Sequence, residues 1–295
     1  MTFPKVSLVI LNWNGRDVLQ ECLSSAAKIE YPNYNIVVVD NGSTDGSQNF
    51  VQQNYPKVCL IENMENLGFA EGQNRGIQYA MESGADFLFV LNNDVTFEQG
   101  ILNELIEAFG DDESIGIAGP VLYDAKHPEV VQAAGTVIRW KTGRVHNLQV
   151  SLIDRTSSPK AINVDSVGMF VAKRALFERI GFFNPKYFAY WEDVDLCFRA
   201  KRAGFRIVCV LTAKLWHKEG HSSRQVAGFH TYYITRNRFW VERAHATLCE
   251  RAQFYAFFFV GIFWYHYIRL LFFEKNATEF RAFLSGMRDG LTQSY

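Results

Sequence analysis

Carboxylates and amides that could bind a ligand follow three apolar segments of this chain. They stand in the stretches "NWNG" (12–15), "DNGSTDGS" (40–47) and "NND" (92–94). Ligands of open α/β sheets bind beyond the carboxyl ends of the strands, at the point where the strand order reverses. Because the three stretches are far apart in sequence yet share this predicted location, we expect them to line one binding crevice.

Asp40 ends an apolar segment, where its carboxylate can accept a hydrogen bond from a ligand. The imide N–H of uracil or thymine is a suitable donor, and the N1–H of guanine is another. Alternatively, Asp40 caps the following turn, as Asp often does. Gly42 and Ser43 suit a tight turn in either case, so the residues alone leave both roles open.

Asp94 is a candidate ligand for a divalent cation that bridges a diphosphate. Mg²⁺ prefers hard oxygen ligands and commonly takes only one or two protein carboxylates. His217 could join Asp94 on one ion, whereas His217 and His221 lack the central residues of the HExxH metal motif. The alternatives are an Asn/Asp turn before a helix at 97–109 and an ordinary surface histidine.

Three glycines in "ENLGFAEGQNRG" (65–76) are spaced by four residues, at positions 68, 72 and 76. The stretch has neither the GxGxxG spacing of dinucleotide-binding folds nor the GxxxxGK[ST] spacing of P-loops. Glycines at i and i+4 share one face of a helix and let it approach a strand or a ligand closely. Plain helix packing is the alternative interpretation.

The segment "YFAYWEDVDLCFRAKRAG" (187–204) holds three carboxylates beside a tryptophan. A helix that begins near Trp191 would place Asp193 with the apolar residues at 196, 197 and 200, on a face that points inward. Partial burial raises a carboxyl pKa, which suits a general base, and the helix N-terminus opposes this by stabilising the anion. Asp193 is therefore the candidate catalytic base, ionised at neutral pH.

The other two carboxylates of this segment are expected on the opposite, solvated face of the helix. Glu192 and Asp195 fall at i and i+3 with arginines at 199 and 202, which makes a charged stripe. We expect Asp195 to pair with one of these arginines.

The elements that must position these residues alternate between strand and helix over the first 120 residues. Continuous apolar runs indicate strands covered on both faces, and they occur at 6–12, 35–40, 57–62, 86–94 and 115–119. Helical patterns lie between them, at 16–28, 44–54, 70–82 and 97–109. Repeated strand–helix–strand units predict an α/β fold with a mostly parallel, doubly wound sheet and right-handed crossovers.

After residue 120 this regularity fades, and short strand-like pieces mix with polar turns. A loop is expected at 152–163, a helix at 173–180 and a strand at 206–211. Beyond "YYITRNRFW" (232–240) the chain is expected to be helical and rich in aromatic residues.

Composition narrows the class of protein. With 48% hydrophobic and 21% charged residues, the chain suits a compact globular protein, and its net charge of −1 does not favour a nucleic-acid partner. The five cysteines are scattered without a CxxC pair, so neither a disulfide framework nor a zinc ribbon is indicated, and a reducing cytoplasm fits best. The first residues lack a basic region and a cleavage site, so no signal peptide is expected.

Aromatic residues crowd into "FYAFFFVGIFWYHYIRLLFF" (254–273). A helix of this length, at ~1.5 Å per residue, would be about long enough to span the hydrocarbon core of a bilayer. However, His266 and Arg269 interrupt the segment, and its Trp and Tyr content favours an interface over a membrane centre. We expect it to rest on a membrane surface, to form a helical dimer interface or to pack as a tail on the rest of the chain.

With these stretches in chain order, the sequence resembles glycosyltransferase family 2, the inverting, nucleotide-sugar-dependent enzymes of the GT-A fold. The resemblance is greatest to bacterial rhamnosyltransferase-like members, and it covers nearly the whole chain. It rests on "VSLVILNWNG", "IVVVDNGSTDGS", "NLGFAEGQNRGI", "FLFVLNNDV", "VGMFVAKRALFERIGFFNPKYFAYWEDVDLCFRAKRAGF", "WHKEGHSS" and "YYITRNRF". It implies a Rossmann-like, mostly parallel sheet flanked by helices, with a C-terminal helical, aromatic-rich extension.

The resemblance also implies roles for residues at matching positions. Asp193 falls at the catalytic base of the family's Glu-Asp motif. Asp94 stands at the last position of the Asp-x-Asp metal motif, and His217 at a later metal-ligand histidine. Asn92 occupies the first acidic position of Asp-x-Asp, so the implied Mg²⁺ or Mn²⁺ site carries one charge fewer.

The same comparison assigns residues to the two substrates. Binding of the donor nucleotide is implied for Asn12, Trp13, Asp40, Gly68, Asn74 and Asn93. The acceptor is expected over the less regular region 121–190, where Gly168 and Met169 would line its floor by position alone, with Trp191 and Glu192 as further candidates for acceptor binding.

These roles imply a domain plan and a function. Residues 1–235 would form the catalytic domain, with a nucleotide-binding half (1–120) and an acceptor half (121–235), and 236–295 a helical extension that contacts a membrane surface or a second copy. The expected reaction transfers a sugar, with rhamnose as the first guess, from a dTDP-, UDP- or GDP-sugar to a saccharide or lipid-linked saccharide. This would serve bacterial cell-surface polysaccharide synthesis in the cytoplasm or at the inner face of the cell membrane.

Two other functions remain open from the sequence. A sugar nucleotidyltransferase shares this α/β style but would need a Gly-rich, Arg-containing phosphate loop after the first strand, where "LNWNGRD" supplies only Gly15 and Arg16. A non-catalytic scaffold of the same fold would have no need of Asp40, Asp94, Asp193 and His217 together.

Overall fold

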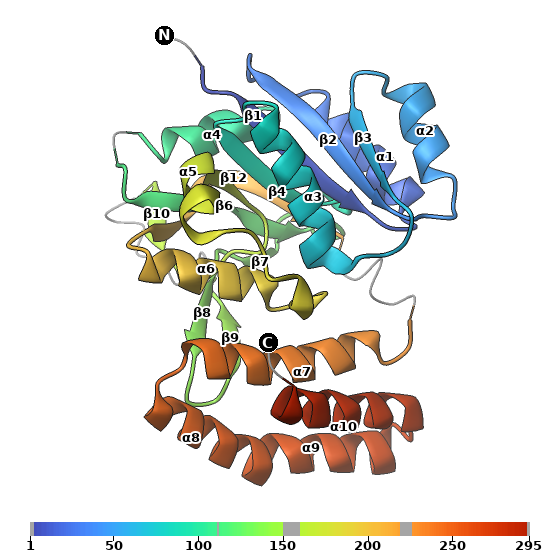
Figure 1. Cartoon of the computed structure of the whole chain (residues 1–295), viewed down its shortest axis with the longest axis vertical. Coiled ribbons are helices and arrows are strands. Elements are labelled where there is room, and N and C mark those ends of the chain that lie inside the picture. Colours follow the sequence, from blue (N-terminus) through green and yellow to red (C-terminus); the bar gives the residue numbers. More distant parts are fainter. Residues whose placement is uncertain (1–2, 111, 150–159, 219–225, 294–295) are drawn as a thin grey trace.

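The computed structural model of the chain describes residues 3–110, 112–149, 160–218 and 226–293. An α/β body is stacked on a layer of C-terminal helices (Figure 1). This architecture confirms the expected fold class, an α/β fold followed by a helical, aromatic-rich region. Most of the loop expected at 152–163, and His221 with it, lie outside the described residues.

The described residues of the body form a ten-stranded sheet. Its order is β10 (Ala161–Asn163), β12 (Arg206–His217), β6 (Ile115–Asp124), β11 (Phe170–Lys173), β4 (Phe87–Asn92), β1 (Val6–Asn12), β2 (Tyr34–Asn41) and β3 (Cys59–Asn63). Two short strands join this path, β5 (Val95–Phe97) on β12 and β7 (Val131–Ala133) on β6. The long pairings β1–β2, β1–β4, β2–β3 and β6–β12 are parallel, and the antiparallel pairings involve the shorter strands.

The strand order reverses at β1. The chain builds outward from β1 through β2 to β3 and then places β4 on the other side of β1. In this register Asn12 lies beside Asp40, and Leu11 lies beside Asn92. The polar ends of these strands therefore meet at one edge of the sheet, where α/β proteins bind ligands.

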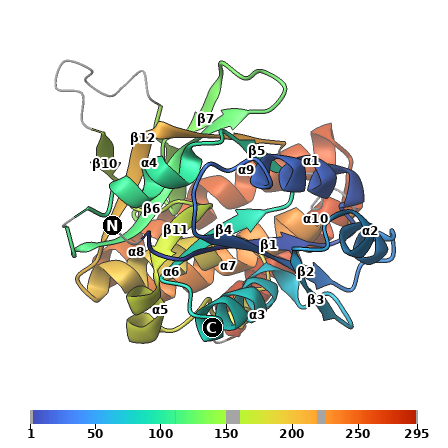
Figure 2. The same cartoon turned by 90° about the horizontal axis from the view of Figure 1, so that it is seen from above.

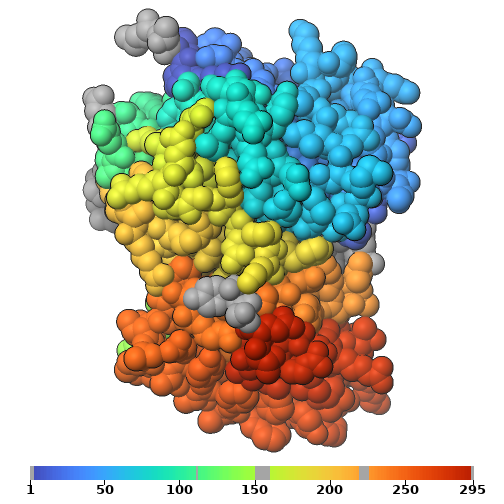
Figure 3. Space-filling view, in the orientation of Figure 1, coloured from blue at the N-terminus to red at the C-terminus, as the bar shows by residue number. Residues whose placement is uncertain are grey.

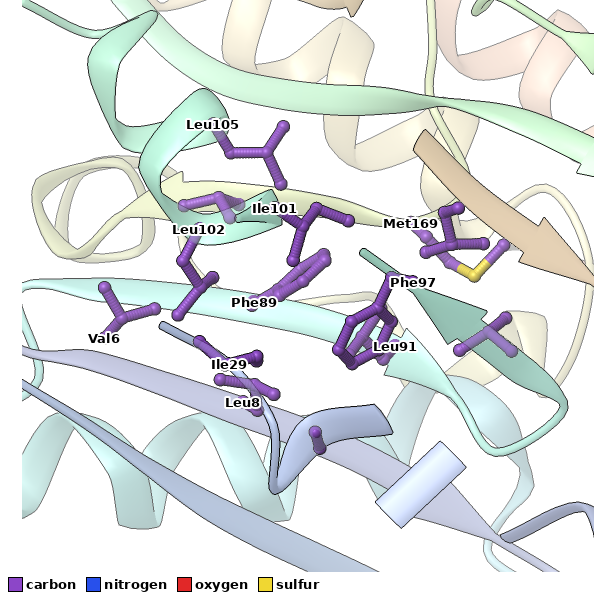
Figure 4. Close-up of a cluster of buried hydrophobic side chains, with 14 of the residues drawn as sticks. Val6, Leu8, Ile29, Phe89, Leu91, Phe97, Ile101, Leu102, Leu105 and Met169 are labelled. Atoms are coloured by element: carbon purple, nitrogen blue, oxygen red, sulfur yellow. The ribbon is translucent and has the colours of Figure 1, made fainter. Parts of the chain in front are cut away.

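Helices cover both faces of the sheet because the side chains of each strand alternate between them. Leu8 of β1 joins one buried cluster (Figure 4), and its neighbour Val9 joins another. Helices α1 and α4 supply the first cluster, and α3, α5 and α6 supply the second; Figure 2 shows α1 and α4 across the sheet from α3. The helices of the body are α1 (Arg16–Ala26), α2 (Ser47–Asn54), α3 (Gly68–Glu82), α4 (Ile101–Glu107), α5 (Arg174–Ile180) and α6 (Glu192–Arg202).

Helix α3 lies close to β1 and β2 because its glycines face them. A Cβ atom at Gly76 would come within 2.3 Å of Val9 Cγ1, and one at Gly72 within 2.5 Å of Leu11 Cδ1. Real Cβ atoms do not approach so closely. Helix packing therefore accounts for two of the three spaced glycines, and Gly68 has a separate role described below.

Among the element boundaries that differ from the sequence prediction, two involve the last residues of β12 and the short strand β5. The strand expected at 206–211 continues to His217, and the helix expected at 97–109 begins only at Ile101. Both differences have one cause, because β5 pairs antiparallel with the last residues of β12, Leu215–His217. Such pairing depends on contacts far apart in sequence, which local periodicity does not reveal.

The C-terminal helices form their own buried cluster. Helix α7 (Phe229–His245) packs against α6 on one side and α10 (Ala277–Thr292) on the other. Between them, one continuous helix runs from Leu248 to Phe273. It comprises α8 (Leu248–Phe257), a π-helical turn (Phe258–Ile262), α9 (Phe263–Ile268) and a second π-helical turn (Arg269–Phe273). The cluster holds Phe239, Phe254, Phe258 and Phe283.

Helix α7 runs without a break across residue 235, the expected boundary between the catalytic domain and the helical extension.

The outer face of the long helix is apolar and exposed. By length and composition the helix Leu248–Phe273 could cross a membrane, and only 17% of its apolar window is buried in the structure. The helix lies along the end of the molecule farthest from the sheet (Figures 1 and 3). Its exposed large side chains include Phe259, Val260, Trp264, Tyr265, Ile268, Phe272 and Phe273.

Candidate active site

A cavity of ≈ 660 Å³ opens between the carboxyl ends of the strands and the helical layer. Most residues that the sequence singled out for chemistry reach its surface. They are Trp13, Gly68, Asn92, Asn93, Asp94, Gly168, Met169, Trp191, Glu192, Asp193 and His217. The fold thus brings the ends of β1, β4 and β12 and the start of α6 to one cavity, as expected.

Asp40 and Asn12 lie behind the cavity surface, both almost fully buried. Asp40 accepts hydrogen bonds from Asn12 Nδ2, from the backbone N–H of Ser43 and from Gln48 Nε2, each at 2.8 Å. Asn12 Oδ1 in turn accepts a bond from Asn93 Nδ2 at 2.7 Å. The turn-capping alternative for Asp40 is therefore present, and its reading of a nucleobase stays a prediction.

Asn74 lies apart from the cavity, on the buried side of α3. Its Nδ2 donates to the carbonyl of Phe183 at 2.9 Å, and its Oδ1 accepts from the Phe183 N–H at 3.0 Å. Both ends of the amide thus tie α3 to the segment before α6. This contact gives Asn74 a structural role, and the geometry offers no support for donor binding by its side chain.

The β5–β12 pairing places Asp94 against His217. Asp94 Oδ1 lies 3.3 Å from His217 Nε2, is buried, and accepts no hydrogen bond from the part of the chain that the structure describes. No cluster of three or more His, Cys, Asp or Glu ligands occurs among the described residues. One carboxylate and one imidazole nevertheless suit Mg²⁺ or Mn²⁺, because such ions commonly complete their shells with substrate phosphates and water.

The turn before α6 is strained. Phe188, Tyr190 and Trp191 have φ values of 64°, 67° and 72°, in the left-handed region that non-glycine residues rarely adopt. Each such residue costs on the order of 1–3 kcal/mol. The strained turn positions Trp191 as the N-cap of α6, with Asp193 in the first turn of the helix.

Helix α7 holds this turn through two side chains. Asn237 Nδ2 donates to the carbonyls of Tyr187, Ala189 and Tyr190 at 2.8–2.9 Å. Arg236 donates to the carbonyls of Lys186 and Tyr187 at 2.8 Å. Both residues are buried, so these contacts satisfy carbonyls that water could not easily reach.

Helix α3 supports the same turn from the other side. The backbone N–H groups of Phe69 and Ala70 donate to the carbonyl of Phe188. Gly68 has a φ of +80°, and a Cβ there would come within 2.6 Å of the Phe188 ring and carbonyl. Gly68 therefore needs to be glycine for two reasons, its backbone conformation and this close approach.

Asp193 combines partial burial with hydrogen bonds to its anion. Burial raises its pKa, whereas the N–H groups of Val194 and Asp193 and the hydroxyl of Ser166 oppose the rise. The Ser166 Oγ lies 3.4 Å from Asp193 Oδ2. This environment suits a general base, because a raised pKa increases the proton affinity of the carboxylate.

The solvated stripe predicted for Glu192 and Asp195 is wrong, because both residues are buried. Asp195 does pair with Arg199 at 2.8 Å, as expected, but its other oxygen lies 2.8 Å from Nε2 of His245 on α7. These partners hold the pKa of Asp195 below its usual value despite its burial. Among the described residues Glu192 has no such cationic partner, and burial followed by the nearby Asp193 raises its pKa well above the usual value.

Sequence reasoning missed several residues that line the cavity. Arg144 of β9 (Arg144–Asn147), paired in a hairpin with β8 (Thr136–Arg139), and Arg238 of α7 both reach it. "YYITRNRFW" did stand out in the sequence, but local patterns could not show that α7 folds back over α6. For the β8–β9 hairpin, the sequence indicated only short strand-like pieces between polar turns, and it did not show that the hairpin would reach the cavity.

Comparison with known proteins gives the site its context. The family described as "Glycosyltransferase like family 2" matches residues 4–242, well over half of the chain. The chain belongs to this family. As a family 2 member it is a glycosyltransferase, which confirms the expected class of enzyme.

Curated relatives within family 2 include two rhamnosyltransferases. The chain is 28% identical to the N-acetylglucosaminyl-diphospho-decaprenol L-rhamnosyltransferase of Mycobacterium tuberculosis, over 70% of this chain and 73% of that protein. It is 25% identical to the dTDP-rhamnosyl transferase RfbF of Shigella flexneri, over 80% of this chain and 79% of that protein. These similarities confirm the resemblance to bacterial rhamnosyltransferases.

A solved structure supports the fold. The chain superposes on GalNAc-T7 with UDP, GalNAc and Mn²⁺ with a TM-score of 0.62 and 16% identity, over 90% of this chain. It covers 58% of that longer chain. At this identity the likeness shows the fold alone, and it agrees with the GT-A architecture expected of family 2.

Replacing Asn237 by Ala should destabilise the protein, because three buried carbonyls of the strained turn would each lose a donor. We expect the free energy of unfolding to fall by about 3 kcal/mol, measured by chemical denaturation. Asn103→Ala is the control, since it removes one exposed bond to the Glu30 carbonyl and should cost less than about 1 kcal/mol. Equal losses in the two variants would contradict a special role for Asn237.

Proposed function

We propose that this glycosyltransferase transfers rhamnose, with inversion, from a nucleoside-diphosphate donor to a saccharide or lipid-linked saccharide in cell-surface polysaccharide synthesis. The proposal rests on one geometric observation, that Asp193 faces the same cavity as the Asp94–His217 pair. The sugar and the pathway come from the two curated relatives. dTDP-rhamnose is the first donor to test, followed by UDP- and GDP-sugars.

The reaction needs a base for the acceptor hydroxyl. The Asp193 carboxylate takes the proton as the acceptor oxygen attacks the anomeric carbon, and the bond from that carbon to the nucleoside diphosphate breaks. A single displacement inverts the anomeric configuration. Because burial raises the pKa of Asp193, activity should decline as the pH falls through that raised value.

Residues of the cavity divide between the two substrates. Trp13, Asn93 and Gly68 lie near the ends of the nucleotide-side strands and would receive the donor. Gly168 leaves open space beside the base, since even a Cβ there would meet only Asp193 Oδ2, at 3.7 Å. Met169 and Trp191 complete the surface on which the acceptor would rest.

A divalent cation would bind at Asp94 and His217. The side-chain amide oxygen of Asn92 is a further candidate ligand. When bound, Mg²⁺ or Mn²⁺ would neutralise the charge of the leaving diphosphate. Asp94 Oδ1 is buried, accepts no hydrogen bond from the described residues and lies 3.3 Å from His217 Nε2. This supports the assignment, because buried carboxylate oxygens normally have a hydrogen-bond partner or a ligand.

The exposed face of the helix Leu248–Phe273 is proposed to contact a membrane surface, at the cytoplasmic side. Trp264 is 52% and Tyr265 59% exposed, and these amphipathic side chains favour the boundary between water and lipid. The helix also borders the cavity side of the molecule, because Phe257 packs under Arg144, a cavity residue. A lipid-linked acceptor could therefore reach the cavity from a membrane on this side.

Asp193→Asn should abolish most turnover while donor binding persists. The amide cannot accept the acceptor proton, so we expect kcat to fall by about 10²–10⁴-fold, measured by sugar transfer with the donor that wild type uses. Asp86→Asn, the same change at an exposed residue just before β4 and so at the other end of that strand from the site, should keep wild-type activity. If Asp193→Asn transferred the sugar at a near-native rate, Asp193 would not be the general base.

Asp94→Asn should weaken Mn²⁺ binding in the presence of a nucleoside diphosphate by at least about tenfold. Electron paramagnetic resonance of free Mn²⁺ reports this affinity without reference to activity. Chelation with EDTA should stop transfer by wild type, and added Mg²⁺ or Mn²⁺ should restore it. Unchanged Mn²⁺ affinity in Asp94→Asn would place the cation elsewhere.

Trp264→Ser combined with Phe272→Ser should reduce co-sedimentation with vesicles that contain anionic lipid. The two substitutions remove exposed apolar area from the proposed contact face. Met64→Ser is the control, because Met64 is 98% exposed and belongs to the α/β body. A different outcome would contradict membrane contact: wild type does not co-sediment with vesicles but forms dimers, and the double variant is monomeric. The exposed face of the helix Leu248–Phe273 would then be an interface between two copies of the chain.

A further inference from the structure

Two arginines line the cavity without a matching anion. Arg144 extends from β9 and Arg238 from α7. The part of the chain that the structure describes offers neither guanidinium an ion pair or hydrogen bond, and the buried Nε of Arg238 has no partner. Their contacts are with rings: Arg144 lies 5.2 Å from the centroid of Phe257, and Arg238 lies 5.9 Å from that of Trp191.

The two cations are close enough to repel each other. Burial lowers the pKa of Arg238 to about 10; the charge of Glu242 opposes this shift, and that of Arg144 adds to it. Arg238 therefore stays charged at neutral pH. Two like charges facing one cavity favour a bound anion, because an anion relieves their repulsion.

Nearby carboxyl groups do not cancel this charge. Burial raises the pKa of Glu242 to about 8 in spite of Arg238, and the pKa of Glu192 lies well above its usual value. With its pKa at about 8, Glu242 is mostly protonated at pH 7, since a carboxyl group stays neutral below its pKa. Burial shifts Glu192 in the same direction, toward its neutral form. Asp193 is the acid of this region that must remain ionised for the proposed reaction.

The two arginines contact other elements than β5 and β12, whose pairing places the proposed cation ligands. Arg238 lies over Trp191, which precedes the acidic pair of α6 directly, so it is on the side of the catalytic base. Arg144 is held beside α8, because the hairpin turn at Gly143 packs against Phe254 and Glu242. Figure 1 shows the β8–β9 hairpin reaching from the body to the helical layer.

We propose that Arg144 and Arg238 form a subsite for the phosphate groups of the acceptor, a sugar joined to a lipid through a diphosphate. The inference rests on the proposed function and adds to it the residues that recognise the acceptor. Planar guanidinium groups bind phosphate oxygens in a bidentate manner. From this subsite the lipid chain would leave along Phe257 and the apolar face of the long helix, while the sugar reaches Asp193.

Direct binding tests the subsite without turnover. The full chain is titrated by calorimetry, in EDTA to exclude metal-mediated contacts, with farnesyl diphosphate, farnesol and inorganic pyrophosphate. Wild type should bind farnesyl diphosphate at least tenfold more tightly than farnesol. Arg144→Gln and Arg238→Gln should each reduce the affinity for farnesyl diphosphate roughly tenfold and leave farnesol binding unchanged.

Matched variants control for charge and folding. Arg139→Gln makes the same change directly across the hairpin from Arg144, outside the cavity lining, and should bind farnesyl diphosphate as wild type does. Arg238→Lys keeps the charge and should retain part of the preference for the diphosphate. The inference is overturned if wild type shows no such preference, if the cavity variants keep it, or if Arg139→Gln loses it equally.

The pyrophosphate and nucleotide titrations assign the subsite. If pyrophosphate binds wild type but not the double variant Arg144→Gln/Arg238→Gln, the arginines recognise the phosphate groups themselves. Binding of dTDP with Mg²⁺ should be the same in all variants, and an equal loss of dTDP would assign the arginines to the donor and overturn the inference. If the diphosphate preference is present but no dTDP-, UDP- or GDP-sugar supports transfer, the proposed function fails and the subsite stands.

Discussion

The candidate active site depends on the hydrogen bonds that Asn237 and Arg236 donate to the turn at 186–190. Three residues of that turn and helix start have left-handed backbone conformations, each unfavourable by about 1–3 kcal/mol. Such a turn persists only where its surroundings determine it. Five hydrogen bonds from two α7 side chains do so here, and Arg236 is itself fixed over the Trp240 ring at 4.1 Å. The helical region thus contributes to the candidate site, since α7 holds the turn that precedes Asp193, the proposed base.

This arrangement also explains how three neighbouring acids acquire different properties. Asp195 is buried against Arg199 and His245, which stabilise its charge. Glu192 is buried without a cationic partner at hydrogen-bonding distance, and its pKa rises accordingly. Asp193 lies between these extremes, because helix N–H groups and Ser166 offset its burial. The pKa is raised at Glu192 and Asp193 and lowered at Asp195, so the environment and not the residue type separates the properties of these acids.

The sequence predicted the strands of the first half and the shared location of Asn92, Asp94 and His217, because buried parallel strands leave continuous apolar runs and end at one edge of the sheet. It could not predict the burial of Glu192 and Asp195. Helical periodicity showed their face of α6 as charged, and only the return of α7, some forty residues later, covers that face. The same limit applies to Asn74, whose partner Phe183 is 109 residues away. Contacts between distant elements decided each of these cases.

The charges around the cavity fit two phosphorylated substrates. Asp94 and His217 lie where the donor strands end, and the arginines lie beside the helices that the lipid part of an acceptor would follow. With Asn92 in place of an acid, the cation site keeps a single carboxylate, so a divalent ion there retains net positive charge for the leaving diphosphate. The arginine pair carries permanent charge and needs no metal. In the proposed function each diphosphate would therefore meet its own source of positive charge, in the one cavity that Asp193 also lines.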